Sequence, residues 1–284
     1  MKKILIIGSS GLFGSYLKKN FKYKNHQIIY FKRNLRSNLN NRTFCTKYLL
    51  KNNFDVIINL AAITNIDYCE KNKKIAYQTN FELVKNLCNI IDKNSLSTYL
   101  IQFSTDQFYN NYKKNFENHH VCVNYYAQTK LLAEKSCLKI NSIILRTNFS
   151  GKSNAINRVS FSDWIFKSIK KNKKIYLADD ILFNPLSFQT LKKVILKVLK
   201  KRVNGIFNVG SKKGFSKYKF GVVFAKKLNL NLANIIRVKY KDIKFLSSRN
   251  KDMRMRTKRF EEKFNFKLNN LENEINIMCK DYKI

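Results

Sequence analysis

The chain has 284 residues, of which 44% are hydrophobic and 13% aromatic, and this composition excludes intrinsic disorder as the main state. No apolar run approaches the ~20 residues that a membrane-spanning helix needs, so we expect a cytoplasmic protein without membrane insertion. The 56 Lys and Arg against 18 Asp and Glu give a formal net charge of +38, which favours anionic partners. Because this charge is spread along the chain and no nucleic-acid-binding motif accompanies it, we interpret it as compositional and expect no nucleic-acid partner.

The first half of the chain alternates strand-like apolar runs with helical patterns. Strands are predicted over residues 4–7, 27–31, 55–60, 98–104 and 142–146, and helices over 12–21, 69–91 and 125–138. Continuous β-branched runs separated by helices are typical of a parallel sheet that is covered on both faces. We therefore predict an α/β fold with a Rossmann-like, doubly wound parallel sheet.

The second half is less regular. Helices are predicted over 160–170, 187–201 and 216–228, and a late strand over 206–209 is expected to rejoin the first sheet. This pattern predicts a Rossmann domain of residues 1–150 plus about 186–210. A smaller, discontinuous C-terminal substrate domain would comprise about 151–185 and 211–284.

The cysteines and histidines do not form a recognisable metal site. None of the six cysteines belongs to a C-x-x-C pair, and their spacing fits neither a zinc site nor a compact disulfide framework, so we predict buried free thiols. His119 and His120 are expected to lie in an exposed loop. The sequence thus indicates no metal ligand set.

A glycine-rich turn follows the first predicted strand and leads into the first helix. Glycine allows a tight turn and close approach of the backbone to a pyrophosphate, and the helix N-terminus offers N–H groups to the phosphates. Its G-x-x-G-x-x-G spacing is similar to that of the extended short-chain dehydrogenase/reductases. The candidate cofactor-binding residues in this turn are Gly8, Ser10, Gly11, Leu12, Phe13 and Gly14.

The end of the second predicted strand indicates which nicotinamide cofactor is preferred. An acidic residue at this place binds the ribose 2′-hydroxyl of NAD, but here Lys32 and Arg33 follow Phe31, and the next carboxylate is Asp55. Two cations suit a 2′-phosphate. We therefore expect NADP(H) to be preferred, with NAD(H) as the alternative.

Three residues further along have the chemistry of a ketone reductase. Tyr126 and Lys130 are four residues apart and share one face of the predicted helix, so the ammonium can lower the pKa of the phenol. Tyr126 would then give a proton to a carbonyl oxygen as a hydride reaches the carbon, and Lys130 would also hold the nicotinamide ribose. Thr105, at the end of a strand, would orient the same oxygen.

These motifs, taken together, resemble the dTDP-4-dehydrorhamnose reductase family of nucleotide-sugar ketoreductases, within the extended short-chain dehydrogenase/reductases. The matching segments span nearly the whole chain: 6–14, 59–64 with Asp67 and Glu70, Asn80, 102–106, 126–131 with Glu134, 145–149 and 205–210. The resemblance implies an NAD(P)-dependent oxidoreductase that reduces a nucleoside-diphosphate-linked keto-deoxysugar for surface polysaccharide or glycan precursor biosynthesis. It also implies a homodimer.

The resemblance further assigns individual residues. It implies a catalytic triad of Thr105, Tyr126 and Lys130, and a cofactor lined by Ala61, Ala62 and Thr64. It implies substrate contacts from Thr105, Gln107, Tyr126, Phe149 and Arg249, with Phe149 beside the sugar ring and Arg249 on the nucleotide phosphate. Gln107 stands where the family often has tyrosine, and residues 161–164 are expected either to enter the substrate pocket or, at Trp164, to pack in the core.

Two other functions are compatible with the same motifs. A nucleotide-sugar epimerase could retain its NAD and return the hydride, whereas a dehydratase is disfavoured because Asp106 is the sole carboxylate next to Thr105 in the sequence. A non-catalytic, NADP-binding regulatory subunit is disfavoured by the intact Thr-Tyr-Lys set.

Overall fold

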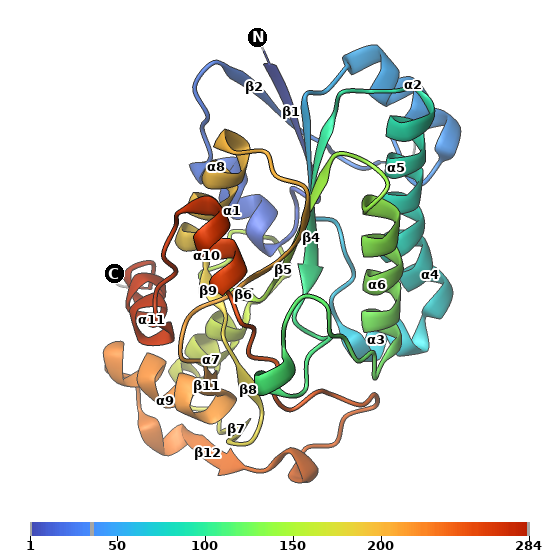
Figure 1. The fold of residues 1–284 in the computed structure, drawn as a ribbon. Coiled ribbons are helices and arrows are strands. Elements are labelled where there is room, and N and C mark those ends of the chain that lie inside the picture. The colour runs from blue at the N-terminus through green and yellow to red at the C-terminus, as the bar shows by residue number, and fades with distance from the viewer. Residues whose placement is uncertain (1, 35–36, 283–284) are drawn as a thin grey trace. The chain divides into compact units, whose positions relative to one another are not determined.

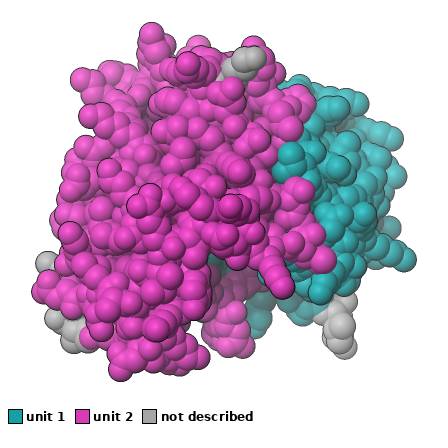
Figure 2. All heavy atoms as spheres, turned by 90° about the horizontal axis from the view of Figure 1, so that it is seen from below, with its two compact units in different colours: residues 1–105, 122–145, 202–206 teal, residues 106–121, 146–201, 207–284 magenta. Residues whose placement is uncertain are grey.

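The computed structural model describes residues 2–34 and 37–282, and these form two compact units. The first unit consists of residues 1–105, 122–145 and 202–206, and the second of 106–121, 146–201 and 207–284 (Figure 2). The domain boundaries expected from the sequence stay a prediction.

The central element is a six-stranded sheet with the strand order β10-β5-β4-β3-β1-β2. Its strands are β1 (Lys2–Ile7), β2 (His26–Tyr30), β3 (Val56–Asn59), β4 (Tyr99–Thr105), β5 (Ser142–Thr147) and β10 (Gly205–Val209). The pairs β1–β2, β1–β3 and β3–β4 are parallel, as predicted for the doubly wound fold. β10 lies beside β5, which confirms that the late strand rejoins the first sheet.

Helices of the first unit cover the sheet with their apolar sides. α2 (Arg42–Asn52), α5 (Leu83–Lys93) and α6 (Tyr125–Cys137) lie on one face in Figure 1. Leu5, Ile57 and Leu100 of the strands pack with residues of these three helices in one buried core. α1 (Leu12–Asn20) contacts β4 through Phe13, whose ring centroid lies 5.8 Å from that of Phe103.

The helical stretch predicted over 69–91 is present, but it is not one regular helix. The chain instead forms α3 (Ile66–Lys71), α4 (Lys73–Tyr77), a π-helical turn η1 (Gln78–Glu82) and then α5. Asn72 leaves helical geometry between α3 and α4, with φ −124° and ψ 56°. Asn80, inside the π-helical turn, is buried and points its amide at the backbone of Ile63, so the helix is interrupted where a side chain holds a neighbouring loop.

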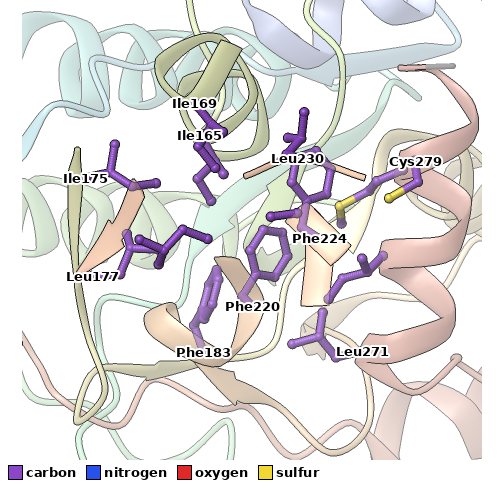
Figure 3. Packing of buried hydrophobic residues seen from close by; sticks show 14 of the residues in the cluster. Ile165, Ile169, Ile175, Leu177, Phe183, Phe220, Phe224, Leu230, Leu271 and Cys279 are labelled. Carbon is purple, nitrogen blue, oxygen red and sulfur yellow. The ribbon is translucent and has the colours of Figure 1, made fainter. Parts of the chain in front are cut away.

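The second unit combines helices with short two-stranded sheets. Its helices are α7 (Phe161–Lys170), α8 (Phe188–Lys200), α9 (Lys217–Lys227), α10 (Lys258–Phe264) and α11 (Leu271–Lys280), with the 3-10 turns η2 (Tyr112–Lys114), η3 (Leu232–Asn234) and η4 (Tyr240–Asp242). The paired strands are β6 (Phe149–Ser150) with β9 (Leu186–Ser187), β7 (Ile175–Ala178) with β12 (Ile235–Val238), and β8 (Leu182–Phe183) with β11 (Phe215–Ser216). Figure 3 shows the apolar core of this unit, in which α7, α9 and α11 bring together residues such as Ile165, Phe220 and Leu271.

The burial of the cysteines and histidines largely agrees with the prediction from the sequence. The six cysteines are free thiols, five of them buried and Cys122 partly exposed, and His119 and His120 are exposed. In the part of the chain that the structure describes, no helix is long and apolar enough to cross a membrane.

Candidate active site

The glycine turn after β1 is packed so tightly that side chains would not fit at two positions. Gly8 has φ +83°, and a Cβ atom there would lie 2.6 Å from the backbone nitrogen of Ala61. A Cβ at Gly14 would overlap the Gly8 carbonyl oxygen and lie 2.7 Å from the Cα of Ser9. These glycines are therefore required by the fold of the turn itself.

Gly11 is different, because the turn around it leaves room. It is the N-cap of α1 and has no side-chain cap, and the nearest described atom to an added Cβ would be the Gly8 carbonyl oxygen, at 3.2 Å. The first turn of α1 holds no acidic residue. N–H groups without a side-chain cap and the absence of negative charge fit the pyrophosphate of a dinucleotide.

The other residues of the turn contribute in different ways. Ser10 is exposed and Leu12 is half-buried. Phe13 is 2% exposed and packs against Phe103, so its side chain belongs to the core and its backbone N–H is the group that a phosphate can use.

The loop after β3 runs directly beside the glycine turn. The Leu60 N–H donates to the Ile7 carbonyl at 2.9 Å, and Ala61 approaches Gly8 closely, as described above. Asn80 holds Ile63 at both backbone groups, accepting from its N–H at 2.8 Å and donating to its carbonyl at 3.1 Å. Ala61 and Ala62 are half-buried and Thr64 is exposed.

The end of β2 is tied to the same turn. Ser9 Oγ donates to the carbonyl oxygen of Phe31 at 3.1 Å. Lys32 and Arg33 follow immediately and are exposed. Two cations are thus placed within two residues of a contact with the glycine turn.

The three predicted catalytic residues lie on β4 and α6. Thr105 ends β4, and Tyr126 and Lys130 are buried on α6, one helical turn apart. Lys130 Nζ donates to the carbonyl oxygen of Phe103 at 2.7 Å, which fixes the ammonium to β4 two residues before Thr105. The amide of Asn124 caps α6 by accepting from the Ala127 N–H at 2.9 Å, and this defines where the helix begins.

Burial and a neighbouring carboxylate act on Lys130 in opposite directions. Desolvation lowers the pKa of Lys130 from 10.5 to about 8, and the negative charge of Glu134 acts to raise it. Glu134 is itself buried and accepts from Ser104 Oγ at 2.5 Å. The ammonium and the carboxylate are therefore held on the same helix, each with a bond to β4.

In the second unit, the chain continues from Thr105 into a polar cluster. Asp106 is buried, and its two carboxylate oxygens accept from the amides of Asn148 at 2.6 Å and Gln107 at 3.2 Å. Gln107 also donates to Met253 Sδ at 2.7 Å. Burial raises the pKa of the Asp106 carboxyl, and the amide contacts and Lys217 act against this rise.

The remaining predicted substrate-binding residues are also in this unit. Phe149 begins β6, is half-buried and has its ring centroid 5.8 Å from that of Phe188. Arg249 is half-buried with its guanidinium 5.0 Å from the ring centroid of Phe245. The next residue, Asn250, donates to the Gln107 carbonyl at 2.8 Å, so the structure brings the arginine segment to Gln107.

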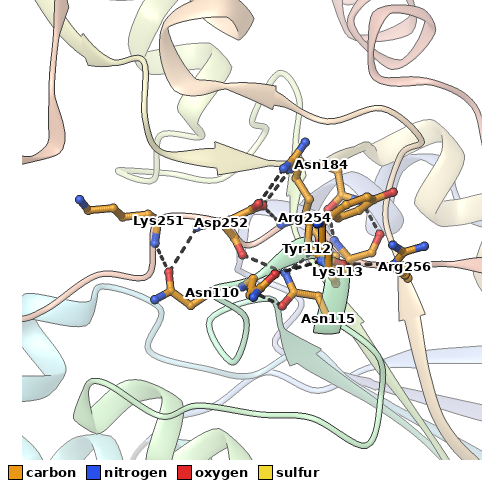
Figure 4. A network of polar contacts seen from close by, with 11 residues as sticks. Asn110, Tyr112, Lys113, Asn115, Asn184, Lys251, Asp252, Arg254 and Arg256 are labelled. Atoms are coloured by element: carbon orange, nitrogen blue, oxygen red, sulfur yellow. Dashed lines mark hydrogen bonds and ion pairs between the residues drawn. The ribbon is translucent and has the colours of Figure 1, made fainter.

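Neighbouring arginines are already engaged by protein groups. Arg254 forms a bidentate pair with Asp252, at 2.8 and 2.6 Å, and lies over the ring of Tyr112 (Figure 4). Arg256 lies over the same ring and donates to the Tyr112 carbonyl. Both guanidiniums therefore fasten η2 to the segment after Arg249.

The structure excludes one of the two expectations for Trp164 and shows a contact of Lys217 that the sequence did not indicate. Trp164 is 40% exposed and stacks on Phe161, so it is not a core residue. Lys217, which the sequence analysis does not single out, lies over the ring of Phe183 with its Nζ 3.4 Å from the ring centroid. A lysine in a chain with 56 basic residues gives no signal of its own, and this contact arises only from tertiary structure.

The parallel sheet, with a glycine turn at its first strand and a tyrosine and lysine one turn apart on α6, defines an extended short-chain dehydrogenase/reductase fold. Within this class, the chain belongs to the family described as the RmlD substrate binding domain, whose model matches residues 1–284.

Several known proteins are similar to this chain. The dTDP-4-dehydrorhamnose reductase of Bacillus anthracis, solved in complex with NADP, superposes with a TM-score of 0.90 at 19% identity, over 99% of this chain and 100% of that chain. A hypothetical dTDP-4-dehydrorhamnose reductase from Sulfolobus tokodaii has a TM-score of 0.78 at 26% identity, covering 92% of this chain and 94% of its own. The probable low-salt glycan biosynthesis reductase Agl14 of Haloferax volcanii is 25% identical over 174 residues, or 59% of this chain and 57% of that relative. The match to this relative thus spans somewhat more than half of its length.

Proposed function

We propose that this protein is an NADPH-dependent reductase of a nucleoside-diphosphate-linked keto-deoxysugar that serves glycan precursor biosynthesis. The observation that carries the proposal is the fixed position of Lys130, whose ammonium is bound to β4 two residues before Thr105 and lies one turn from Tyr126 on α6. Family membership over residues 1–284 supports the same activity.

The protein's residues have separate roles in the proposed reaction. The bound dinucleotide supplies the hydride. Tyr126 gives the proton to the ketone oxygen, Lys130 stabilises the phenolate that is left and holds the nicotinamide ribose, and Thr105 donates a hydrogen bond that orients the ketone. Because Tyr126 and Lys130 are 6% and 2% exposed, bulk water is largely excluded from the proton donor.

The cofactor preference rests on the residues after β2. Lys32 and Arg33 are exposed cations directly after Phe31, which accepts the hydrogen bond from Ser9 of the glycine turn. A 2′-phosphate beside this turn would meet two positive charges and no carboxylate. NADPH is therefore preferred over NADH, in keeping with the NADP in the Bacillus anthracis neighbour.

The substrate side is proposed for the second unit. Gln107, Phe149 and Arg249 contact the nucleotide sugar, with Phe149 beside the sugar ring and Arg249 on the diphosphate. The proposal for Arg249 is supported by its neighbour Asn250, which donates to the Gln107 carbonyl at 2.8 Å and so brings this segment to another predicted substrate residue. We also propose that the protein is cytoplasmic and forms a homodimer. Light scattering of the purified protein tests the homodimer.

Substitution Tyr126→Phe tests the proposed activity. Stopped-flow or steady-state oxidation of NADPH and NADH is followed with a panel of nucleotide-linked 4-keto-6-deoxysugars. We expect turnover that prefers NADPH, and a fall in kcat of about 10²–10⁴-fold in Tyr126→Phe, because the proton donor is lost. Tyr125→Phe, one residue earlier on α6, is the matched control and should retain activity.

The outcomes separate this activity from the two alternatives. Tight cofactor binding without net oxidation, together with interconversion of two nucleotide sugars, would indicate an epimerase. Cofactor binding with neither reaction would indicate a regulatory subunit. Absence of cofactor binding would refute the site itself.

A further inference from the structure

Glu70 joins the helix that follows the predicted cofactor loop to the helix that carries the proposed proton donor. It lies on α3, and its carboxylate accepts a hydrogen bond at 3.2 Å from the backbone N–H of Tyr125, the first residue of α6. The two residues are 55 positions apart in the sequence, and the Glu70 side chain is 30% exposed. Glu70 belongs to a segment that resembles the family, yet the proposed reaction gives it no role.

The start of α6 is fixed by acceptors on both sides of Tyr126. Asn124, the N-cap, accepts from the Ala127 N–H at 2.9 Å, and Glu70 accepts from the Tyr125 N–H. The first N–H groups of a helix have no intrahelical partner, and a carboxylate beside them is favoured by the helix dipole. The first turn of α6 has no acidic residue of its own, so the carboxylate at this helix end comes from α3.

α3 is also tied to the loop after β3. Cys69, the neighbour of Glu70, donates from its Sγ to the Ile63 carbonyl at 3.3 Å. Ile63 packs against the apolar cluster that contains the buried Cys69 and Tyr126. Contacts thus run from the loop predicted to line the cofactor, through α3, to the first turn of α6.

The proposed reaction depends on the alignment of these two elements. A hydride must reach the ketone carbon from the cofactor while a proton reaches the ketone oxygen from Tyr126. A misplacement of about 1 Å in such a site can lower the rate about 100-fold. Because Tyr126 is the second residue of α6, the place where this helix begins determines where its phenol lies.

We propose that Glu70 is a positioning residue, which sets the place of Tyr126 relative to the bound cofactor through the Tyr125 backbone. This inference rests on the proposed reductase function and deepens it. The acceptor oxygen carries the effect and the net charge does not, because Lys73 lies 3.3 Å from the same carboxylate and pairs with it.

Two substitutions of similar size test the need for the acceptor. Glu70→Met keeps the length of the side chain without an acceptor, whereas Glu70→Gln keeps an amide oxygen for the Tyr125 N–H. We expect kcat to fall about 10- to 100-fold in Glu70→Met and to change less than about threefold in Glu70→Gln, with KM for the keto sugar nearly constant in both. Calorimetric titration with NADPH counts the folded sites, so a loss of folded protein is not read as a loss of kcat. An unchanged kcat in Glu70→Met, or an equal fall in both variants, would overturn the proposal.

Lys73→Met is the control for the ion pair. It removes the cation beside Glu70 and the contact of that cation with the Tyr125 ring, at 5.5 Å, but leaves the carboxylate in place for the Tyr125 N–H. We expect kcat to be unchanged. A fall as large as that in Glu70→Met would assign the effect to the ion pair and refute the role of the backbone bond.

A double-mutant cycle with Tyr126→Phe asks whether Glu70 acts through Tyr126. Single-turnover rates are measured for both single variants and for the combination. We expect Glu70→Met to have little further effect when Tyr126 is already phenylalanine, because no proton donor is left to position. An equal reduction in both backgrounds would mean that Glu70 supports the fold in general.

Hydrogen exchange separates this proposal from the proposed function, because it needs no substrate. Exchange of the amides at the start of α6 should be about two- to tenfold faster in Glu70→Met than in the unaltered protein or in Glu70→Gln, since one hydrogen bond is lost. If the unaltered protein reduces no ketone, the proposed function fails, and the exchange still decides whether Glu70 fixes the start of α6. Equal exchange in all three proteins would refute the role of Glu70.

Discussion

The protonation state of the buried Lys130 depends on its immediate neighbours. Burial favours the neutral amine of Lys130, while Glu134, four residues further along α6, favours the ammonium form. Ser104 in turn donates to Glu134 at 2.5 Å. The charge of the residue that supports Tyr126 thus depends on a carboxylate that does not itself belong to the triad.

A pH profile tests this dependence. The ammonium form of Lys130 is present below its pKa of about 8, so we expect kcat/KM to fall as pH rises through this value. Glu134→Gln removes the negative charge that raises the pKa, and the alkaline fall should move to lower pH. Glu272→Gln, at an exposed position on α11, should leave the profile unchanged. An alkaline limb at the same pH in all three proteins would show that Glu134 does not govern the charge of Lys130.

Some residues of the site could be predicted from the sequence, and others could not. Thr105, Tyr126 and Lys130 belong to short motifs with a chemical meaning, so their elements could be predicted from spacing. The contact of Lys217 with Phe161 and Phe183 joins three segments that are distant in sequence, and no local pattern carries it. The engagement of Arg254 by Asp252 likewise becomes visible only in the folded chain.

At the scale of elements, the strands of the six-stranded sheet were predictable because they are rich in apolar residues, as in β3, where all four residues are buried. The strands of two to four residues in the second unit were not predicted. α2 was not predicted, since its buried residues Cys45 and Leu49 stand among many polar ones. Asn72 separates α3 from α4, and the π-helical turn η1 contains Asn80, whose amide is bonded to Ile63. Helical periodicity does not reveal such side-chain contacts, so the sequence predicted the helical stretch but not its interruption and its π-helical turn.

The glycine turn offers a test in which two similar substitutions should have different effects. Gly14→Ala places a Cβ against the backbone of Gly8 and Ser9, so we expect a loss of stability of about 2–4 kcal/mol. Gly11→Ala has an ordinary φ of −75° and more room, so the fold should persist while affinity for NADPH falls at least about tenfold, because the methyl group occupies the space of the pyrophosphate. Thermal unfolding and fluorescence titration with NADPH measure the two effects. Equal NADPH affinity of folded Gly11→Ala and the unaltered protein would refute the phosphate site.

For the whole molecule, the dominant feature is the formal net charge of +38. Like charges repel in the compact state, and added salt screens this repulsion. We therefore expect the midpoint of thermal unfolding to rise between low salt and about 0.5 M NaCl, where the Debye length falls to about 4 Å. Differential scanning calorimetry measures this shift, with an uncharged osmolyte of equal osmolality as the control. A midpoint that falls with salt would mean that attractive ion pairs outweigh the repulsion.

The bonds of Asn80 have a consequence for the affinity of the cofactor. Its amide holds Ile63 in the loop beside the glycine turn and also donates to Thr129 Oγ1 on α6, at 3.2 Å. Loosening this loop would leave a buried amide unpaired, at a cost of about 1–3 kcal/mol. The loop is therefore ordered when the chain folds and not when the dinucleotide arrives, so the entropy of ordering it does not subtract from the binding free energy.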